Sequence, residues 1–224
     1  MIYITGDIHG DRKRLSWLKL RNLKEGDTLI ICGDFGFLWE NTTAEQNYIM
    51  SLGKRKYNIC FVDGTHENFN KIYRCRETIW KGGHVHRISG NLFHLMRGQI
   101  LEIDGNSFFT FGGGESTDND MRVEYGLWWR NEEPSPYEMA DGAKRLDEAD
   151  CKVDYIITHE PPSLVKSSIL LRLGKTDRIN KLNAYLDEIN RSCKFKQWYF
   201  GSMHTDKFIS ESHIALFKNI VCTE

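Results

Sequence analysis

The opening of the chain carries a carboxylate and an imidazole at alternate positions, Asp7 and His9. They follow the short apolar run Ile2–Ile4, which is typical of a β-strand and stops before Gly6. Alternate side chains of an extended backbone point the same way, so both groups would project from the strand's carboxyl end. An oxygen donor beside a nitrogen donor suits a divalent cation such as manganese, iron or zinc. Taken alone, the pair equally fits a turn with an Asx hydrogen bond and a surface histidine.

Other metal-type or acid–base residues follow other apolar runs of the sequence. They are Asp34, His66, His159 and His204. A lone histidine after a strand is more often exposed, or hydrogen-bonded in the core, than a metal ligand. The carboxyl ends of parallel strands, however, meet at the ligand-binding edge of an open α/β sheet. The repeated pattern therefore predicts that these side chains share one pocket.

Strands and helices that could position these residues alternate in the first third of the chain. The apolar periodicity predicts strands over residues 2–4, 28–32 and 57–62, and helices over residues 11–22 and 43–52. This βαβαβ order implies right-handed crossovers and a parallel sheet.

Short β-like runs follow, over residues 84–88, 92–96, 100–103 and 107–112. Hairpin signals separate some of them, so we expect an antiparallel meander that forms a second sheet. A long irregular stretch over residues 112–136 then leads into helices over 137–150 and 177–192. Strands are expected over 153–158, 197–200, 207–210 and 213–217. With no linker in view, we expect one domain over residues 1–224, with two sheets and helices outside.

The composition excludes a strongly positive electrostatic field over the whole protein. Thirty Lys and Arg residues face 31 Asp and Glu residues, and the pI is about 6.7. We therefore expect neither nucleic acid nor a membrane surface as partner. The six cysteines are scattered without a C-x-x-C pair, which argues against a zinc ribbon or a thioredoxin-type site. No leader or membrane-spanning run is visible, so a cytoplasmic protein with reduced thiols is expected.

The ordered motifs resemble those of the calcineurin-like metallophosphoesterase superfamily, which read D-x-H, G-D, G-N-H-D/E, a lone H after a strand, and G-H-x-H. The matching stretches are Gly6–Gly10, Gly33–Asp34, Gly64–Glu67, Thr158–His159 and Gly201–His204. The resemblance covers nearly the whole chain. It implies an α/β fold in which two mixed β-sheets, flanked by helices, form a four-layer αββα sandwich. The G-D-x-x-D-R-G form found in protein serine/threonine phosphatases of the superfamily is absent, which argues against that branch.

The same resemblance implies a first metal ion held by Asp7, His9 and His204, with Asp34 bridging to a second ion. His159 would be one of the ligands that complete the second site.

The sequence departs from the pattern at two other ligands of that second site. Thr65 stands in place of the asparagine of G-N-H, and Ser202 in place of the first histidine of G-H-x-H. Protonated hydroxyls are poor ligands beside an amide oxygen or an imidazole. We therefore expect one firmly bound divalent ion (Mn, Fe or Zn) and a second that is weak or absent. In the alternative, both hydroxyls coordinate through water and a dinuclear site survives.

By the same resemblance, His66 is a general acid rather than a ligand. The implied reaction is hydrolysis of a phosphate mono- or diester by metal-bound hydroxide, with His66 protonating the leaving group. Asp34 is the second residue assigned a catalytic role. Arg122 is predicted to bind the phosphate, and Arg97 and Arg130 are weaker candidates.

Two further alternatives stay open at the level of the sequence. Trp128 and Trp129 could form a lid over the substrate, or could pack the long loop onto the core. The substrate would be a phosphorylated small molecule or a phosphoprotein. Because Thr65 and Ser202 weaken the ligand set, the competing function is a catalytically impaired module that binds a phosphate ligand or a protein partner.

Overall fold

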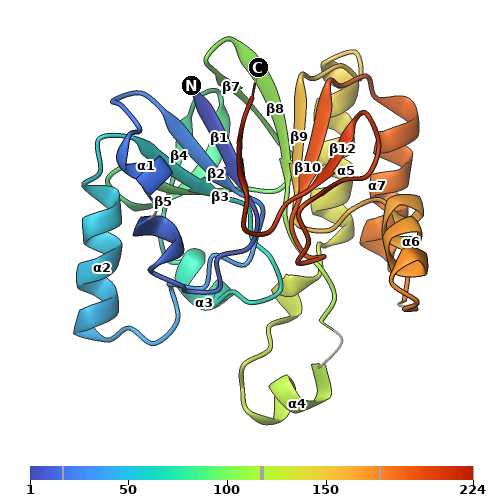
Figure 1. Ribbon diagram of the computed structural model, residues 1–224. Helices are drawn as coiled ribbons and strands as arrows, with labels where there is room; N and C mark the ends of the chain where they lie inside the picture. Colours follow the sequence, from blue (N-terminus) through green and yellow to red (C-terminus); the bar gives the residue numbers. More distant parts are fainter. Residues whose placement is uncertain (17, 117–118, 177, 224) are drawn as a thin grey trace.

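Two mixed β-sheets face each other in the computed structural model, and helices cover the outer face of each sheet (Figure 1). The structure describes residues 1–16, 18–116, 119–176 and 178–223. The layers run helix, sheet, sheet, helix, which confirms the four-layer α/β architecture expected from the motifs.

The first sheet has the strand order β13-β1-β2-β3-β6-β5-β4. Its strands are β1 (Ile2–Thr5), β2 (Thr28–Ile31), β3 (Asn58–Phe61), β4 (Arg76–Trp80), β5 (Gly83–Ser89), β6 (Leu92–Leu95) and β13 (Ile220–Cys222). The central strands β1, β2, β3 and β6 run parallel to one another. All four residues of β2 are buried, which explains its continuous apolar sequence, since a central parallel strand is covered on both faces.

The second sheet has the order β11-β12-β10-β9-β8-β7. Its strands are β7 (Gln99–Ile103), β8 (Asn106–Phe111), β9 (Tyr155–Thr158), β10 (Gln197–Phe200), β11 (Lys207–Phe208) and β12 (His213–Ala215). Here β8, β9, β10 and β12 run parallel. The loops that follow the parallel strands therefore lie at the carboxyl-end edges of the two packed sheets.

The helices lie outside the sheets. They are α1 (Leu18–Arg21), α2 (Thr43–Gly53), α3 (Phe69–Ile72), α4 (Asn119–Glu124), α5 (Pro136–Glu148), α6 (Ser163–Arg172) and α7 (Lys181–Ser192), with 3₁₀ turns at Arg14–Ser16 and Arg130–Glu132. A capping box of Ser135 and Glu138 begins α5. The segment around α4 extends away from the two sheets (Figure 1). None of the helices in the described ranges is long and apolar enough to cross a membrane.

The main core fills the space between the sheets. Fully buried Ile4, Ile30 and Cys60 from the first sheet belong to one cluster with Phe108 and Ile157 from the second. Two further clusters lie beneath the outer helices. Each fully buried large apolar side chain contributes about 1.5–3 kcal/mol of transfer free energy, so this packing fixes the sheets, and with them the loops at their edges.

The expected second-sheet meander is wrong, because its strands belong to both sheets. Strands β5 and β6 extend the first sheet, where Cys60 of β3 pairs with Phe93 of β6. Strands β7 and β8 form the edge hairpin of the second sheet. Turn signals fix which strands are antiparallel neighbours, but the choice of sheet depends on contacts remote in sequence.

The helix expected over residues 11–22 is also wrong, since the structure has only a 3₁₀ turn and the short α1 there. The buried guanidinium of Arg14 donates to the backbone oxygens of Asp7 and Phe217. These tertiary hydrogen bonds hold the segment against the loops after β1 and β12, and a regular helix does not form there. The helix expected from residue 177 begins at Lys181, and Asp177 lies outside the described residues. The sequence pattern also missed α6, β4 and β13.

Candidate metal centre

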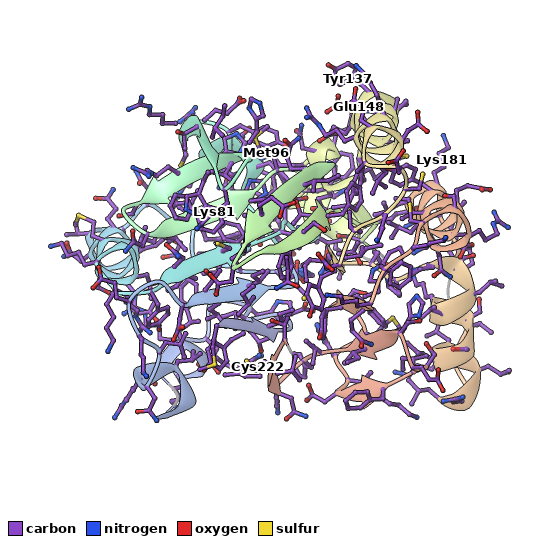
Figure 2. All side chains as sticks on the ribbon, turned by 90° about the horizontal axis from the view of Figure 1, so that it is seen from above. Lys81, Met96, Tyr137, Glu148, Lys181 and Cys222 are labelled. Carbon is purple, nitrogen blue, oxygen red and sulfur yellow. The ribbon has the colours of Figure 1, made fainter. Side chains whose placement is uncertain are left out.

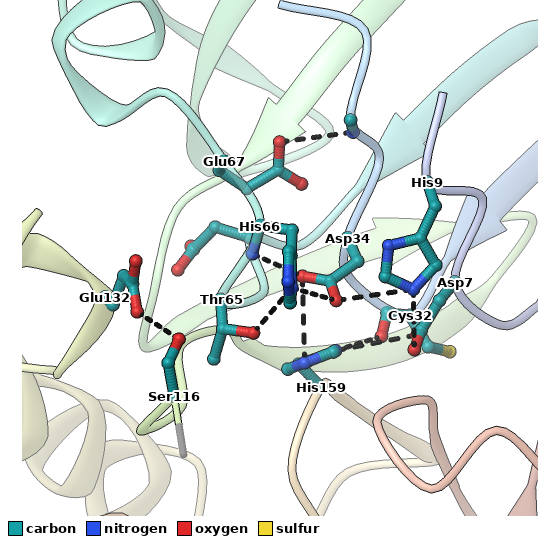
Figure 3. A network of polar contacts seen from close by, with 12 residues as sticks. Asp7, His9, Cys32, Asp34, Thr65, His66, Glu67, Ser116, Glu132 and His159 are labelled. Atoms are coloured by element: carbon teal, nitrogen blue, oxygen red, sulfur yellow. Dashed lines mark hydrogen bonds and ion pairs between the residues drawn. The ribbon is translucent and has the colours of Figure 1, made fainter. Parts of the chain in front are cut away.

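Four of the predicted site residues meet at the carboxyl ends of the strands. Asp7, His9, Asp34 and His204 each offer a ligand atom, and these four atoms all lie within 4.8 Å of one another. They come from the loops after β1, β2 and β10. Figure 3 shows Asp7, His9 and Asp34 together with His159. Two carboxylates and two imidazoles in this space form a ligand set suited to a divalent transition metal.

The spacing of the two imidazoles matches joint ligation. Nε2 of His9 and Nε2 of His204 lie 3.0 Å apart. This separation is short enough for both nitrogens to bind one ion at about 2.1 Å each. Both rings are partly exposed, with 33% and 50% of their side-chain surfaces accessible, so the ion position is open on the solvent side.

The carboxylate of Asp7 shows that the arrangement fits a cation. Asp7 is fully buried, and neither of its oxygens has a hydrogen-bond partner among the described residues. Nε2 of His204 lies 3.0 Å from one oxygen, and Nδ1 of His159 lies 3.6 Å from the other. A buried carboxylate without hydrogen bonds is costly, and an ion at this position would compensate its charge.

The backbone around the site is held in an unusual conformation. His9, Asp34 and His204 have φ angles of 49°, 44° and 47°. Left-handed backbone at non-glycine residues costs of order 1–3 kcal/mol each and collects at functional sites. The strain is held by bonds between loops, because the backbone N–H groups of Ile8 and His9 both donate to the carbonyl of Asp34.

Two glycines let the strand ends approach. A β-carbon on Gly64 would overlap the carboxylate of Asp34, and one on Gly201 would overlap that of Asp7. Each glycine therefore belongs to one loop and makes room for a ligand-type side chain from another. This explains why glycine begins the third and the last of the five motifs that surround the site.

The loops after β2 and β3 clamp each other. The backbone N–H of His66 donates to Oδ1 of Asp34 at 2.7 Å, while Glu67 accepts from the backbone N–H groups of Phe35 at 2.6 Å and Gly36 at 3.4 Å. Glu67 is fully buried. Burial, and then the charge of Asp34, raise its pKa well above the usual value for a glutamate.

His66 projects beside the four clustered residues. Its Nδ1 lies 3.1 Å from Oδ2 of Asp34 and 3.0 Å from the hydroxyl of Thr65. The hydrogen bond to Asp34 raises the pKa of His66, against an opposing effect of burial. Its side chain is 46% exposed and its ring centroid lies 5.3 Å from that of His9. The imidazole thus borders the site and remains accessible to a ligand.

His159 lies deeper than the other histidines. It is 2% exposed, with Nδ1 3.1 Å from the carbonyl oxygen of Cys32 and Nε2 3.8 Å from Oδ1 of Asp34. Burial lowers its pKa, but the carboxylates of Asp34 and Asp7 raise it by more, so the net shift of the pKa is upward. A cation held by those two carboxylates would take the place of the proton.

The two departures from the family pattern have different surroundings. The hydroxyl of Thr65 contacts His66, and its backbone carbonyl accepts from Arg122 at 2.9 Å. The hydroxyl of Ser202 is buried and has no hydrogen-bond partner among the described residues.

The candidate phosphate-binding arginines have other partners in the structure. Arg122 is buried and forms an ion pair of 2.7 Å with Glu132, together with a hydrogen bond to Ser116. Its contact with phosphate stays a prediction. Arg97 bonds to Asp63 and Glu138 on another side of the β3 loop, and its contact with phosphate likewise stays a prediction.

The tryptophan pair is partly accounted for by packing. The ring of Trp129 lies edge to face against Trp39, with centroids 5.6 Å apart. This contact joins the long loop to the loop after β2. A lid role for Trp128 and Trp129 stays a prediction.

Arg14 is the residue near the centre whose role the sequence did not indicate. Its guanidinium donates to the backbone oxygen of Asp7 at 2.5 Å and to the hydroxyl of Thr5 at 3.2 Å. An arginine in an amphipathic segment looks solvent-exposed in sequence. The only available signal was its position seven residues after Asp7.

Comparison with known proteins agrees with this geometry. The model of the calcineurin-like phosphoesterase family matches residues 1–216. No curated protein matches the chain at a significant level. The match covers all five motifs, every strand except β13, and the four clustered residues. The chain therefore belongs to the calcineurin-like phosphoesterase family.

Proposed function

We propose that the protein is a metal-dependent phosphoesterase that hydrolyses a phosphate mono- or diester. The observation that carries the proposal is the cluster of Asp7, His9, Asp34 and His204 around a buried carboxylate that lacks hydrogen bonds. A bound divalent ion would polarise a phosphoryl oxygen and lower the pKa of water at that place. Manganese, iron and zinc all suit these ligands.

The side chains around the ion position would share the remaining tasks. His66 is the proposed general acid, because Nδ1 faces Asp34 and Nε2 is left for the oxygen of the leaving group. Asp34 would hold the ion and orient His66 at the same time. The substrate class that fits this chemistry is a phosphorylated small molecule or a phosphoprotein.

A second metal position is proposed to be weak. Asp34 and His159 could contribute ligands, and Nε2 of His159 lies 3.8 Å from Oδ1 of Asp34. The hydroxyl of Thr65 contacts His66, and that of Ser202 is a neutral donor and acceptor that cannot compensate the charge of an ion. If both hydroxyls act through water, a second ion would still bind, as hard cations often keep water ligands.

Elemental analysis of the protein, purified without added metal, tests the ion and the stoichiometry together. p-Nitrophenyl phosphate and its bis-ester, assayed with added manganese, then test hydrolysis. The proposal expects activity that Asp34→Asn abolishes and that Asp147→Asn, at an exposed position of α5, leaves intact. Activity that survives Asp34→Asn would show a contaminating enzyme.

The weak second position has its own test. Thr65→Asn combined with Ser202→His restores the family ligands, and bound metal should rise toward two ions per chain. If the stoichiometry stays at that of the parent protein, the explanation by these two residues is wrong.

The second candidate function is a binding module for a phosphate ligand or a protein partner. Thr65 and Ser202 favour it, because catalysis depends on full metal ligation more strongly than binding does. Saturable binding of inorganic phosphate, without hydrolysis in any divalent metal, would support this candidate against the enzyme.

A further inference from the structure

A large cavity lies on the other side of the β3 loop from the metal centre. Its volume is about 940 Å³, within the range of small-molecule sites. Residues from many elements line it, among them Tyr73, His86, Met96, Tyr137 and Lys181; Met96, Tyr137 and Lys181 are labelled in Figure 2. The wall contains none of the four clustered residues. Gly114 separates the two sites, because it lines the cavity and packs against Thr65 and His159.

A buried chain of hydrogen bonds ends at this cavity. Arg97 pairs with Asp63, with Nη2 2.5 Å from Oδ2. Nε2 of His94 lies 3.0 Å from Oδ1 of Asp63, and Nδ1 of His94 lies 3.0 Å from Nδ1 of His86. Asp63, His94 and Arg97 are nearly inaccessible to bulk solvent, yet all three contribute to the cavity wall together with His86.

The hydrogen bonds determine the proton positions when both imidazoles are neutral, since the donor in each contact depends on the tautomer. Burial raises the pKa of Asp63, but Arg97 and His94 lower it more, so the carboxylate is ionised and only accepts. Nε2 of His94 must then donate. In its neutral form His94 accepts at Nδ1, so Nδ1 of His86 donates. Nε2 of His86 is left as a lone-pair acceptor at the cavity wall.

Aromatic rings form a column behind the same wall. The centroid distances are 5.2 Å from Phe61 to His94, 5.3 Å from His94 to His86, and 5.5 Å from His86 to Tyr73. Tyr73, which also contacts the ring of Phe69 at 5.8 Å, is 44% exposed and lines the cavity. Offset or edge-on contact with an aromatic ring is favourable at such separations, so the wall suits a planar ring.

The charges of the wall are largely compensated within the chain. Glu138 pairs with Arg97, Asp141 with Arg145, and Glu115 with Arg178. The wall's remaining charged residues, Arg130, Lys181 and Glu133, leave little net charge. A strongly anionic or cationic ligand would therefore find no matching field, whereas a neutral polar ring would.

We propose that this cavity is a second ligand site, which binds a neutral planar heteroaromatic molecule through an N–H donor to Nε2 of His86. Its ring lies against Tyr73. The site is separate from the metal centre and does not depend on the proposed phosphoesterase activity.

Matched pairs of probes test the proposal on the unmodified protein. Theophylline and caffeine differ only in that the N7–H of theophylline is N-methylated in caffeine. Benzimidazole and 1-methylbenzimidazole differ in the same way. Isothermal titration with excess chelator should show that each N–H compound binds at least tenfold more tightly than its methylated partner. Equal affinity within both pairs, or no binding of theophylline and benzimidazole at millimolar concentration, overturns the proposal.

Variants locate the site. Tyr73→Leu, at a partly exposed position, and His86→Phe should each weaken binding of the N–H compounds at least tenfold. His84→Phe, on the same strand but outside the cavity wall, should not change it. Asp34→Asn should also leave it unchanged, and loss in that variant would place the ligand at the metal centre instead.

Nitrogen-15 spectra of the imidazoles give a readout that does not require a folded His86 variant. His86 should show a protonated Nδ1 and an unprotonated Nε2, and theophylline should shift the Nε2 signal. A protonated Nε2 in the free protein contradicts the proposed acceptor.

Discussion

Asp34 receives two hydrogen bonds from one residue, His66, through the backbone N–H at 2.7 Å and through Nδ1 at 3.1 Å. One carboxylate therefore orients both the loop after β3 and the proposed general acid. Glu67 returns the contact by accepting from the backbone of the loop after β2. The two loops behave as one unit, which leads to the first prediction.

Glu67→Ala should loosen the metal centre without removing a ligand. It leaves the buried N–H of Phe35 without its acceptor, which costs about 1–3 kcal/mol of stability. Metal affinity should fall by about 10–100-fold, as for other residues that orient ligands. Urea unfolding and metal titration measure the two effects. Glu148→Ala, on an exposed face of α5, is the control, and unchanged affinity in Glu67→Ala would contradict the clamp.

Added manganese should stabilise the folded protein. At a concentration about 100 times the Kd, linkage adds about 2.7 kcal/mol, which is roughly 5–11 °C in Tm for a chain of this size. Chelator should reverse the shift. Asp7→Asn should abolish it, because that carboxylate lies buried at the ion position. The same shift in Asp7→Asn would place the ion elsewhere.

His66→Gln should reduce turnover while leaving metal content unchanged. Loss of a general acid lowers the rate by about 10²–10⁴-fold. The loss should be larger for an alkyl phosphate than for p-nitrophenyl phosphate, whose leaving group needs little protonation. Kinetics on both substrates, with elemental analysis, measure this difference. His84→Gln is the matched histidine control, and an equal loss on both substrates argues against proton donation.

Arg97→Met should strongly destabilise the fold, because it leaves the buried carboxylate of Asp63 without its cation. Breaking such a pair costs about 3–5 kcal/mol. Lys144→Met removes an exposed pair with Glu148 and should change stability by no more than about 0.5 kcal/mol. Urea unfolding at neutral pH compares the two variants. Similar small losses would mean that Asp63 is not held as an ion.

The pH dependence of stability follows from the same carboxylate. The pKa of Asp63 is lower in the folded protein than the ordinary value of 3.8, because Arg97 and His94 outweigh burial. Its stabilising contribution is therefore present above that value and is lost as pH falls below about 4 toward the folded pKa. Asp63→Asn should flatten the acid limb of a stability curve measured by urea unfolding from pH 6 to pH 3. If the stability of Asp63→Asn fell as steeply at low pH as that of the parent protein, other groups would be responsible for the loss of stability in acid.

The sequence predicted the parallel strands that precede Asp7 and Asp34, because buried parallel strands leave continuous apolar runs and the ligand-type residues directly follow them. It could not assign β5 and β6 to their sheet, since that depends on the pairing of Phe93 with Cys60. The partners of Arg122 and Arg97 were equally hidden. Their carboxylates, Glu132 and Asp63, lie 10 and 34 residues away along the chain, and only tertiary packing brings them together.

The glycines at the strand ends reverse the usual expectation about which positions tolerate change. Thr65 and Ser202 show that a donor atom can be exchanged while the fold keeps its form. Gly64 and Gly201 offer no donor atom, yet even a methyl group there would collide with Asp34 or Asp7. Random mutagenesis should therefore find that Gly64 and Gly201 tolerate fewer substitutions than Thr65 and Ser202.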